Sequence, residues 1–500
     1  MIRAMDPDFR IPALRRRHWL GWLLASGLAL ADPALAAKHG AKKAKHAKHA
    51  TGAKGKGRGK GGGKSAVPAA PAAQTEPALL LPPLPIRERR LANGLQVVSL
   101  ASQTSAAVSV QVWYRVGGKD DPPGRSGFAH LFEHLMFKGT KNTAPETFDR
   151  LTEDVGGQNN AFTAEDMTVY QSEVPANHLE RLLWAEADRM ANLTVDDKNF
   201  ASERLVVIEE LRQRVLADPY GRLFNALPEY GYALHPYRRP VIGSQADLEA
   251  ATLADVQRFH ATHYRPDNAV LLVAGDFEPA ELDAWVDRYF GRLSVPAGPI
   301  PRVRVTEPLR SVDQRVLLNA PQVPLPALAM LWQGPATGHP DGPALEVAAA
   351  LLAAGDSSRL NEALVYRAQL AQSVGFAADL HAEAGLVVAY AIAASGKSLR
   401  LIEGALFTEF QRLAHKPIAA AEMARVRARL LTAALNARQT PQGLAGALGE
   451  AVLLYGDARA ADRRLAQLQA VTAADVQRVL THYVLRARRV TIDYVQGAAA

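Results

Sequence analysis

Residues 252–258 read Thr-Leu-Ala-Asp-Val-Gln-Arg, and residues 472–478 repeat them as Thr-Ala-Ala-Asp-Val-Gln-Arg. The two copies lie 220 positions apart (472 less 252), and a His-Tyr pair and an apolar stretch follow each of them. A repeat of this length predicts two domains of similar fold. Thr252 and Thr472 are suited to cap the helices expected there.

The pattern of apolar and polar residues around the two copies is repeated as well. In the first half we expect strands at 95–100, 107–116, 160–163, 168–174 and 269–274, and helices at 127–137, 145–155, 178–190, 196–216, 247–260 and 279–290. In the second half we expect strands at 316–319, 327–332, 372–378, 386–393 and 489–495, and helices at 343–354, 358–366, 398–412, 419–437, 441–454 and 472–481. A Pro-rich linker at 295–308 separates them. The predicted fold is α+β, with two homologous α/β domains, each a mainly antiparallel sheet packed against helices.

Charge is concentrated near the N-terminus. The 500 residues carry a net charge of +8, and residues 1–83, with 15 Lys or Arg and 4 Asp or Glu, carry +11 of it. Residues 84–500 are left with +8 less +11, or −3, so the basic balance does not indicate a nucleic-acid partner. Cys is absent, which excludes disulfides, thiolate metal sites and a Cys nucleophile, and which fits an oxidising compartment.

Residues 1–36 have the pattern of a signal peptide. A basic cluster at 15–17 precedes an apolar run of 13 residues at 19–31, too short to span a bilayer, and Ala34-Leu35-Ala36 is a small-x-small cleavage site. We expect a periplasmic or secreted protein; the alternative is a membrane anchor that is not cut. Residues 37–84 are rich in Lys, Ala, Gly and Pro and should be disordered. That segment is either a solvated linker or a contact to the membrane or the cell wall.

Residues 127–137, Gly-Phe-Ala-His-Leu-Phe-Glu-His-Leu-Met-Phe, carry the strongest chemical signal. Residues four apart share a helix face, so His130 and His134 can present both imidazoles to one ion. Zinc accepts two His and one carboxylate and keeps a fourth position for water. Glu133 would lie beside the metal, where it can take a proton from that water and pass it to a leaving amine. The alternative is two packed or surface His on an amphipathic helix.

The third ligand should be an acid on another helix. Glu203 and Glu210 are seven positions apart and share one face of the helix expected at 196–216. They are therefore candidates, although such a pair is commonly a solvated acidic stripe.

Together these motifs resemble the pitrilysin and insulin-degrading-enzyme family, which includes the mitochondrial processing peptidases. The resemblance covers about residues 86–496 and extends through Asn93–Leu95, Phe137–Thr140, Asn160–Thr163 and His235–Pro240. It implies a zinc-binding domain at 85–295 and a homologous domain without a zinc site at 309–497.

The resemblance also implies roles for individual residues. By it, His130, His134 and Glu210 bind one zinc ion per chain, Glu133 is the general base, and Glu203 is an outer carboxylate that orients a ligand. A peptide substrate would add as a further strand along an edge strand made of Asn160, Ala161, Phe162 and Thr163.

The second half lacks this chemistry. When Gly139 is aligned with Gly355, Glu346, Ala349 and Ala350 stand at the positions of His130, Glu133 and His134, respectively. We therefore predict no zinc in the second domain.

A substrate-holding pair that the family implies is also missing. Its active members hold the substrate with an Arg and a Tyr seven positions apart, and the aligned positions here carry Val365 and Gln372. Tyr366 and Arg367 are adjacent and would point in different directions on a helix. We therefore expect a heterodimer, in which a related zinc-less subunit supplies the Arg and the Tyr.

The predicted function is that of a zinc-dependent metalloendopeptidase that cleaves peptides or unfolded segments. The competing hypothesis is a non-catalytic, structural or chaperone-like member of the same fold, which needs neither zinc ligands nor a base. A zinc hydrolase of non-peptide amides is a third reading, which only the resemblance disfavours.

Overall fold

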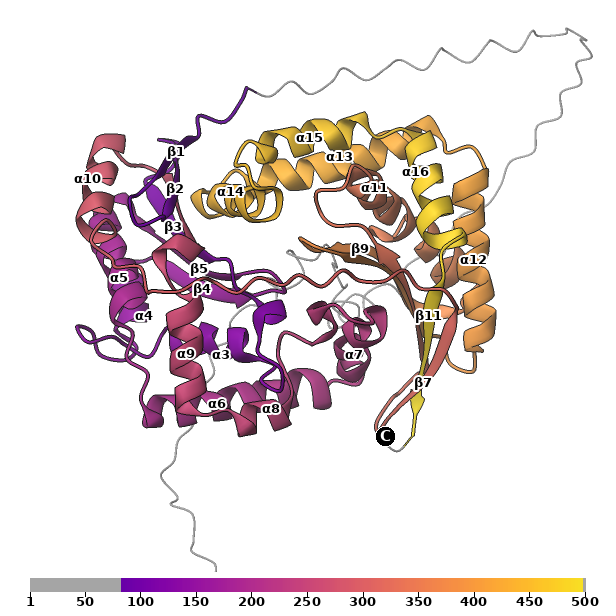
Figure 1. Ribbon diagram of the computed structural model, residues 1–500. Coiled ribbons are helices and arrows are strands. Elements are labelled where there is room, and N and C mark those ends of the chain that lie inside the picture. The colour runs from indigo at the N-terminus through magenta and orange to yellow at the C-terminus, as the bar shows by residue number, and fades with distance from the viewer. Residues whose placement is uncertain (1–81, 498–500) are drawn as a thin grey trace, which may run out of the picture.

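Two β-sheets with helices packed around them form the protein in the computed structural model, which describes residues 82–497 (Figure 1). The first sheet has the order β1-β2-β6-β3-β5-β4 and the second β7-β11-β8-β10-β9. The strands of the first are β1 (Arg87–Arg90), β2 (Gln96–Ala101), β3 (Ala107–Tyr114), β4 (Gln158–Thr163), β5 (Thr168–Pro175) and β6 (Ala269–Gly275). Those of the second are β7 (Gln314–Ala320), β8 (Ala327–Gly334), β9 (Ala371–Leu380), β10 (Gly385–Ala393) and β11 (Arg489–Gln496).

The two sheets have the same topology once β1 is set aside. Replacing β2, β6, β3, β5 and β4 by β7, β11, β8, β10 and β9 converts the first order into the second. Each sheet has one parallel pair, β2 with β6 and β7 with β11, and antiparallel pairs elsewhere. The predicted fold of two homologous, mainly antiparallel α/β domains is therefore confirmed.

The helices follow the same repeat. In the first half they are α3 (Phe128–Leu135), α4 (Thr147–Glu153), α5 (Leu179–Asn192), α6 (Asp197–Leu211), the π-helix η3 (Arg212–Leu216), α7 (Gly221–Gly231), α8 (Gln245–Ala250), α9 (Leu253–His263) and α10 (Pro279–Tyr289). In the second half they are α11 (Gly342–Ala353), the π-helix η6 (Asn361–Arg367), α12 (Leu399–His415), α13 (Ala420–Ala437), α14 (Pro441–Tyr455), α15 (Ala460–Ala470), α16 (Ala473–Leu480) and the π-helix η7 (Thr481–Leu485). Short 3-10 turns at Gly118–Asp120, Ala176–His178, Pro236–Arg238 and Pro266–Asn268 complete the set.

One predicted helix was wrong in its boundaries. The single helix expected at 247–260 is two helices, because Thr252 caps a new helix: its side chain accepts from the Asp255 N–H and the Asp255 carboxylate accepts from the Thr252 N–H. The same capping box begins α16 at Thr472. The helix expected at 358–366 is a π-helix at 361–367. Strand β1 and helices α7 and α15 were not predicted.

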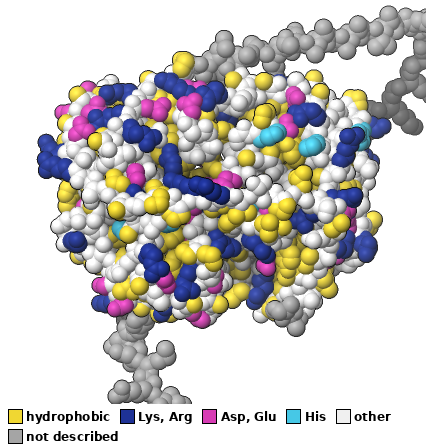
Figure 2. Space-filling model, viewed as in Figure 1, with side chains coloured by type: hydrophobic (Ala, Val, Ile, Leu, Met, Phe, Trp, Pro, Cys, Tyr) yellow, Lys and Arg dark blue, Asp and Glu magenta, His cyan; other side chains and the backbone are white. Residues whose placement is uncertain are grey.

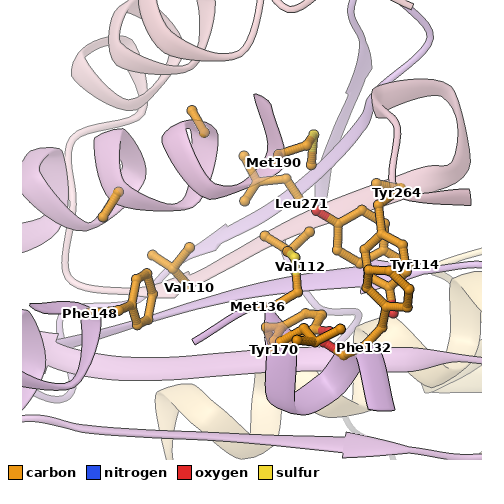
Figure 3. Close-up of a cluster of buried hydrophobic side chains, with 14 of the residues drawn as sticks. Val110, Val112, Tyr114, Phe132, Met136, Phe148, Tyr170, Met190, Tyr264 and Leu271 are labelled. Carbon is orange, nitrogen blue, oxygen red and sulfur yellow. The ribbon is translucent and has the colours of Figure 1, made fainter. Parts of the chain in front are cut away.

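The main core of the first half lies between its sheet and helices α3 and α5. Val112 and Tyr114 of β3 point from the sheet toward Phe132 of α3 and toward Met136, which follows α3, as Figure 3 shows. Val110 of the same strand lies beside Phe148 of α4 (Figure 3). These side chains are almost fully buried, so α3 is held rigidly against the sheet.

The opposite face of each sheet is covered by a helix from the other half. Helix α14 lies beside the first sheet (Figure 1) and packs Leu444, Leu448 and Val452 against β2 and β3. Gly449 lies so close to Trp113 that a Cβ there would be 2.3 Å from the indole. Helix α7 packs Leu223 on the second sheet in the same manner. The halves therefore complete each other's cores, although residues 291–313 between them contain no helix or strand.

Charges of both signs are interspersed over the face shown in Figure 2. This fits the small net charge of residues 84–500. Within residues 82–497, every helix is too short or too polar to cross a lipid bilayer. The signal peptide and the Lys-rich segment expected at 1–36 and 37–84 lie outside the described residues, except for the last three positions.

Candidate metal centre

Helix α3 begins in a way that fixes the direction of its His side chains. Gly127 precedes it with a φ of 93°, and a Cβ there would lie 2.9 Å from the carbonyl oxygen of Ile242, so only glycine fits. The buried Asp121 carboxylate accepts from the N–H groups of Gly127 (2.7 Å) and Ala129 (2.9 Å) and caps the first turn. The short helix is therefore anchored at its start and buried along its length.

Three donor atoms from α3 and α6 converge. Nε2 of His130 lies 3.7 Å from Oε2 of Glu210, and Nε2 of His134 lies 3.3 Å from the same oxygen. Ligand atoms of these three residues all lie within 4.8 Å of one another, and within residues 82–497 they are the single group of this kind. The structure thus brings together the three residues predicted as metal ligands.

Glu203, the predicted supporting acid, lies on the other side of His134. Its Oε2 is 3.6 Å from Nδ1 of His134, and its Oε1 is 2.9 Å from Nζ of Lys138. A carboxylate at Nδ1 favours the tautomer whose Nε2 lone pair faces Glu210, which is the orientation a metal needs. Lys138 was not among the predicted site residues, because its contact with Glu203 joins two segments that are distant in the chain.

Arg214 holds Glu210 from the side away from the imidazoles. Its Nη1 lies 2.6 Å from Oε1 of Glu210, which leaves Oε2 toward the two His. Arg214 lies in the π-helical turn η3 that follows α6. Arg214 was not among the predicted site residues, although an Arg four positions after a Glu on a helix commonly forms an ion pair with it.

Glu203 and Glu210 favour a positive charge at His134, whereas burial disfavours one at His130. Burial outweighs the attraction of Glu210 and lowers the pKa of His130 to about 3. Burial also acts on His134, but Glu203 and Glu210 outweigh it and raise the pKa of His134 to about 9. Against burial, the two imidazoles and Arg214 lower the pKa of Glu210 to about 2. Carboxylates placed in this way stabilise a bound cation.

Glu133, the predicted base, is beside this cluster and not part of it. Its Oε2 accepts a hydrogen bond of 2.8 Å from Oγ1 of Thr163. Burial raises the pKa of Glu133, while His134 and the Thr163 hydroxyl act in the opposite direction. A raised pKa suits a carboxylate that takes up and releases a proton near neutral pH.

The four residues predicted to bind substrate lie on β4, an edge strand of the first sheet. Side chains alternate along it. Thr163 reaches Glu133 and Ala161 packs with the α3 core, whereas Phe162 points to the opposite face and meets Trp113 edge-on at 6.0 Å. Asn160 shares the face of Phe162 by this alternation. The outer edge of β4 borders no other strand among the described residues.

Within its described residues, the second half has no counterpart of the cluster. On α11, Ala349 and Ala350 stand where α3 carries Glu133 and His134, and Glu346 pairs with Arg464 (3.0 Å). Counted from the starts of α6 and α13, Glu203 and Glu210 correspond to Val426 and Ala433.

The two positions aligned with the substrate-holding Arg and Tyr lie on different elements. Val365 lies in the π-helix η6 and Gln372 is exposed on the edge strand β9. The neighbouring Tyr366 is 52% exposed. Arg367 pairs with Glu362 on the same π-helix, with 3.0 Å between Nη2 and Oε2.

The donor set fits zinc. Two imidazole nitrogens and one carboxylate oxygen on rigid helices form a common protein ligand set of catalytic zinc, which leaves the fourth position open. Thiolate ligands are excluded because the chain has no Cys.

Models of one peptidase family match successive parts of the chain. A family model described as "Insulinase (Peptidase family M16)" matches residues 96–245, and "Peptidase M16 inactive domain" matches residues 250–430. The chain is 35% identical over 283 residues to "Zinc protease PqqE" of Helicobacter pylori, covering 56% of this chain and 64% of that relative. This chain thus spans less than two thirds of that relative's length.

Other relatives are matched over most of their length. An "Uncharacterized zinc protease" of Mycobacterium leprae is 30% identical over 415 residues, 80% of this chain and 89% of that protein. A "Probable mitochondrial-processing peptidase subunit beta" of Arabidopsis thaliana is 25% identical over 406 residues, 80% of this chain and 76% of that protein. The crystal structure of a protease from Helicobacter pylori superposes with a TM-score of 0.79 at 27% identity, over 82% of this chain and 99% of that chain.

Proposed function

The chain belongs to the insulinase peptidase family, family M16, and on that premise we propose that it is a zinc-dependent metalloendopeptidase. The observation that carries the proposal is the convergence of His130, His134 and Glu210 with Glu133 beside them. Relatives named zinc proteases support the choice of metal.

In the proposed mechanism, His130, His134 and Glu210 hold the metal and Glu203 orients His134. Zinc, when bound, supplies a Lewis acid that lowers the pKa of water to about 7 and polarises the scissile carbonyl. The carboxylate of Glu133 accepts the proton of the attacking water and later delivers it to the leaving amine nitrogen. Arg214 keeps Glu210 ionised and turned toward the two imidazoles.

The proposed substrates are peptides or unfolded segments. An extended chain could pair with the outer edge of β4, because a strand edge offers unpaired backbone N–H and C=O groups. Such pairing would place a peptide bond next to α3, since Thr163 at the end of β4 contacts Glu133.

We further propose that this chain is the catalytic subunit of a heterodimer. Val365 and Gln372 stand where a substrate-holding Arg and Tyr are expected, so another chain should supply these groups. A relative named as a subunit, the processing peptidase β chain, supports pairing in principle. Gel filtration and peptide assays of this chain with and without a co-expressed homologue test the idea; full activity of the isolated chain would contradict it.

A non-catalytic role fits only the second half. The "inactive domain" description covers residues 250–430, where Ala349 and Ala350 replace the base and a ligand. The first half carries all three candidate zinc ligands and the candidate base. A purely structural role for the whole chain would give these four residues no function.

Export is also part of the proposal, on the signal-peptide pattern of residues 1–36. N-terminal sequencing of the mature protein from cell fractions tests it. A mature periplasmic or secreted protein beginning after Ala36 is expected, and an intact Met1 in the cytoplasm would contradict it.

The direct test of catalysis is Glu133→Gln, which keeps the size of the side chain and removes its basicity. Zinc content should stay at the wild-type level, while cleavage of an internally quenched peptide library should fall by about 100-fold or more. Full activity of the variant would show that the mechanism is wrong.

A further inference from the structure

Thr163 occupies an unusual position, because it ends the edge strand β4 and also contacts the proposed base. Its hydroxyl donates to Oε2 of Glu133 across 2.8 Å, and its side chain is 1% exposed. Among the described residues, the Glu133 carboxylate has no other hydrogen-bond donor. The Thr163 hydroxyl therefore determines which carboxylate oxygen is engaged and leaves Oε1 for another proton.

The fold aims this hydroxyl at α3. Ala161 and Thr163 share one face of β4, since side chains alternate along a strand, and Ala161 packs into the α3 core. Asn159, also on this face, donates to Thr152 of α4 across 2.6 Å. Phe162 is turned to the other face, against Trp113. Thr is β-branched, so its rotamer is restricted and the hydroxyl has a defined direction.

The second half provides an internal comparison. Thr163 and Thr168 are the closing pair of the β4–β5 hairpin, and Leu380 and Gly385 are the closing pair of the β9–β10 hairpin. Both turns contain four residues, so Leu380 is the structural counterpart of Thr163. The counterpart of Glu133 is Ala349. The half with the carboxylate thus carries the hydroxyl, and the half without the carboxylate carries an apolar side chain.

We propose that Thr163 is a positioning residue for the reaction: its hydroxyl holds Glu133 in the orientation in which Oε1 accepts the proton of the attacking water. The inference rests on the proposed peptidase function. Thr163 also connects Glu133 to β4, the strand along which the peptide would pair. The same residue therefore affects the position of the substrate and the position of the base.

Three variants of the full-length, zinc-loaded chain test the proposal, assayed on an internally quenched peptide library with the partner subunit if activity requires one. T163V keeps the β-branched shape and removes the hydroxyl. T163S keeps the hydroxyl. T168V is the matched control, because Thr168 closes the same hairpin but donates to the Val116 carbonyl (2.9 Å) instead of Glu133.

The expected result is a fall in kcat of about 10- to 100-fold for T163V with little change in KM, because general acid–base catalysis depends on placement of the base. T163S should recover most of the kcat. T168V should keep the wild-type kcat, and all three variants should keep wild-type zinc content. Wild-type kcat in T163V, or an equal loss in T168V, would overturn the proposal.

Crystal structures of the zinc-loaded wild type and T163V give a second readout that needs no turnover. Glu133 should have one conformation in the wild type and a different or divided one in T163V. An unchanged Glu133 conformation in T163V would overturn the positioning role. A wild type without peptidase activity would instead count against the proposed function, and the crystallographic comparison would still decide the positioning role.

Discussion

Helices α3 and α11 occupy the same place in two domains of the same topology, yet only α3 carries a candidate metal site. Where α3 presents His130, Glu133 and His134, helix α11 presents Glu346, Ala349 and Ala350, two of which are small and apolar. The second helix of the site differs in the same way, since Glu210 on α6 corresponds to Ala433 on α13. The fold thus supplies the location, and a few side chains on two helices supply the chemistry.

The largest effect should come from removing the anionic ligand of α6, which α13 lacks at the corresponding position. Glu210→Gln removes the anionic ligand, so we expect zinc affinity to fall by more than about 100-fold and peptidase activity to disappear at limiting zinc. Equilibrium zinc titration measures the affinity. Glu209→Gln, an exposed neighbour that points away from the imidazoles, is the control. Wild-type affinity in the Glu210 variant would remove this residue from the ligand set.

The second prediction concerns α14, the helix of the second half that packs on the first sheet. Leu448 of α14 is fully buried against the first sheet, so Leu448→Ala should cost about 2–5 kcal/mol of unfolding free energy. The loss should appear in the first half as well, and the fluorescence of Trp113 should report it because this indole contacts α14. Leu401→Ala, at a residue 55% exposed, should change stability by less than about 0.5 kcal/mol. Unfolding of the first half at the wild-type denaturant concentration would contradict mutual stabilisation.

A smaller effect is expected at Glu203, whose counterpart in the second half is Val426. Glu203→Gln should weaken zinc binding or activity about 10- to 100-fold, as is usual for a carboxylate that orients a metal-ligating His. Lys138→Gln, which removes only the partner of Glu203, should have a weaker effect in the same direction. Zinc titration and kcat/KM measure both variants. An effect of Glu203→Gln as large as that of Glu210→Gln would mean that Glu203 binds the metal directly.

The smallest effect should arise where the two halves meet. His381 lies 3.7 Å from Glu165 of the first half and 3.5 Å from Asp379 of the second. Burial opposes its charge, but these acids outweigh burial and raise the pKa of His381 to about 10.

The direction of the pH effect follows from this shift. The pKa of an unfolded His is about 6.5, so the stabilisation is complete below that pH and is lost as pH rises toward 10. The melting temperature should fall over this range, and it should fall more steeply in the wild type than in His381→Gln. His415→Gln, at the exposed end of α12, should retain the wild-type slope. Parallel curves for His381→Gln and the wild type would exclude this contribution.

Local spacing explains what could be predicted from the sequence. The His130 and His134 pair depends only on helical periodicity, and the 220-residue repeat pointed to two related sheets. The contact between Thr163 and Glu133 could not be predicted, because it joins a strand end to a helix and depends on the pairing register of β4. Helix α7 was missed because Pro228 interrupts its pattern and because its apolar side chains face the second sheet, far along the chain.

The most direct test of the proposed metal site is an anomalous difference map at the zinc absorption edge from crystals of the zinc-loaded chain. We expect one strong peak within about 2.0–2.2 Å of Nε2 of His130, Nε2 of His134 and a carboxylate oxygen of Glu210. We expect no peak at Glu346, Ala349 and Ala350 of the second half. The absence of zinc between the two imidazoles, or an equal peak at the second position, would contradict the proposed site.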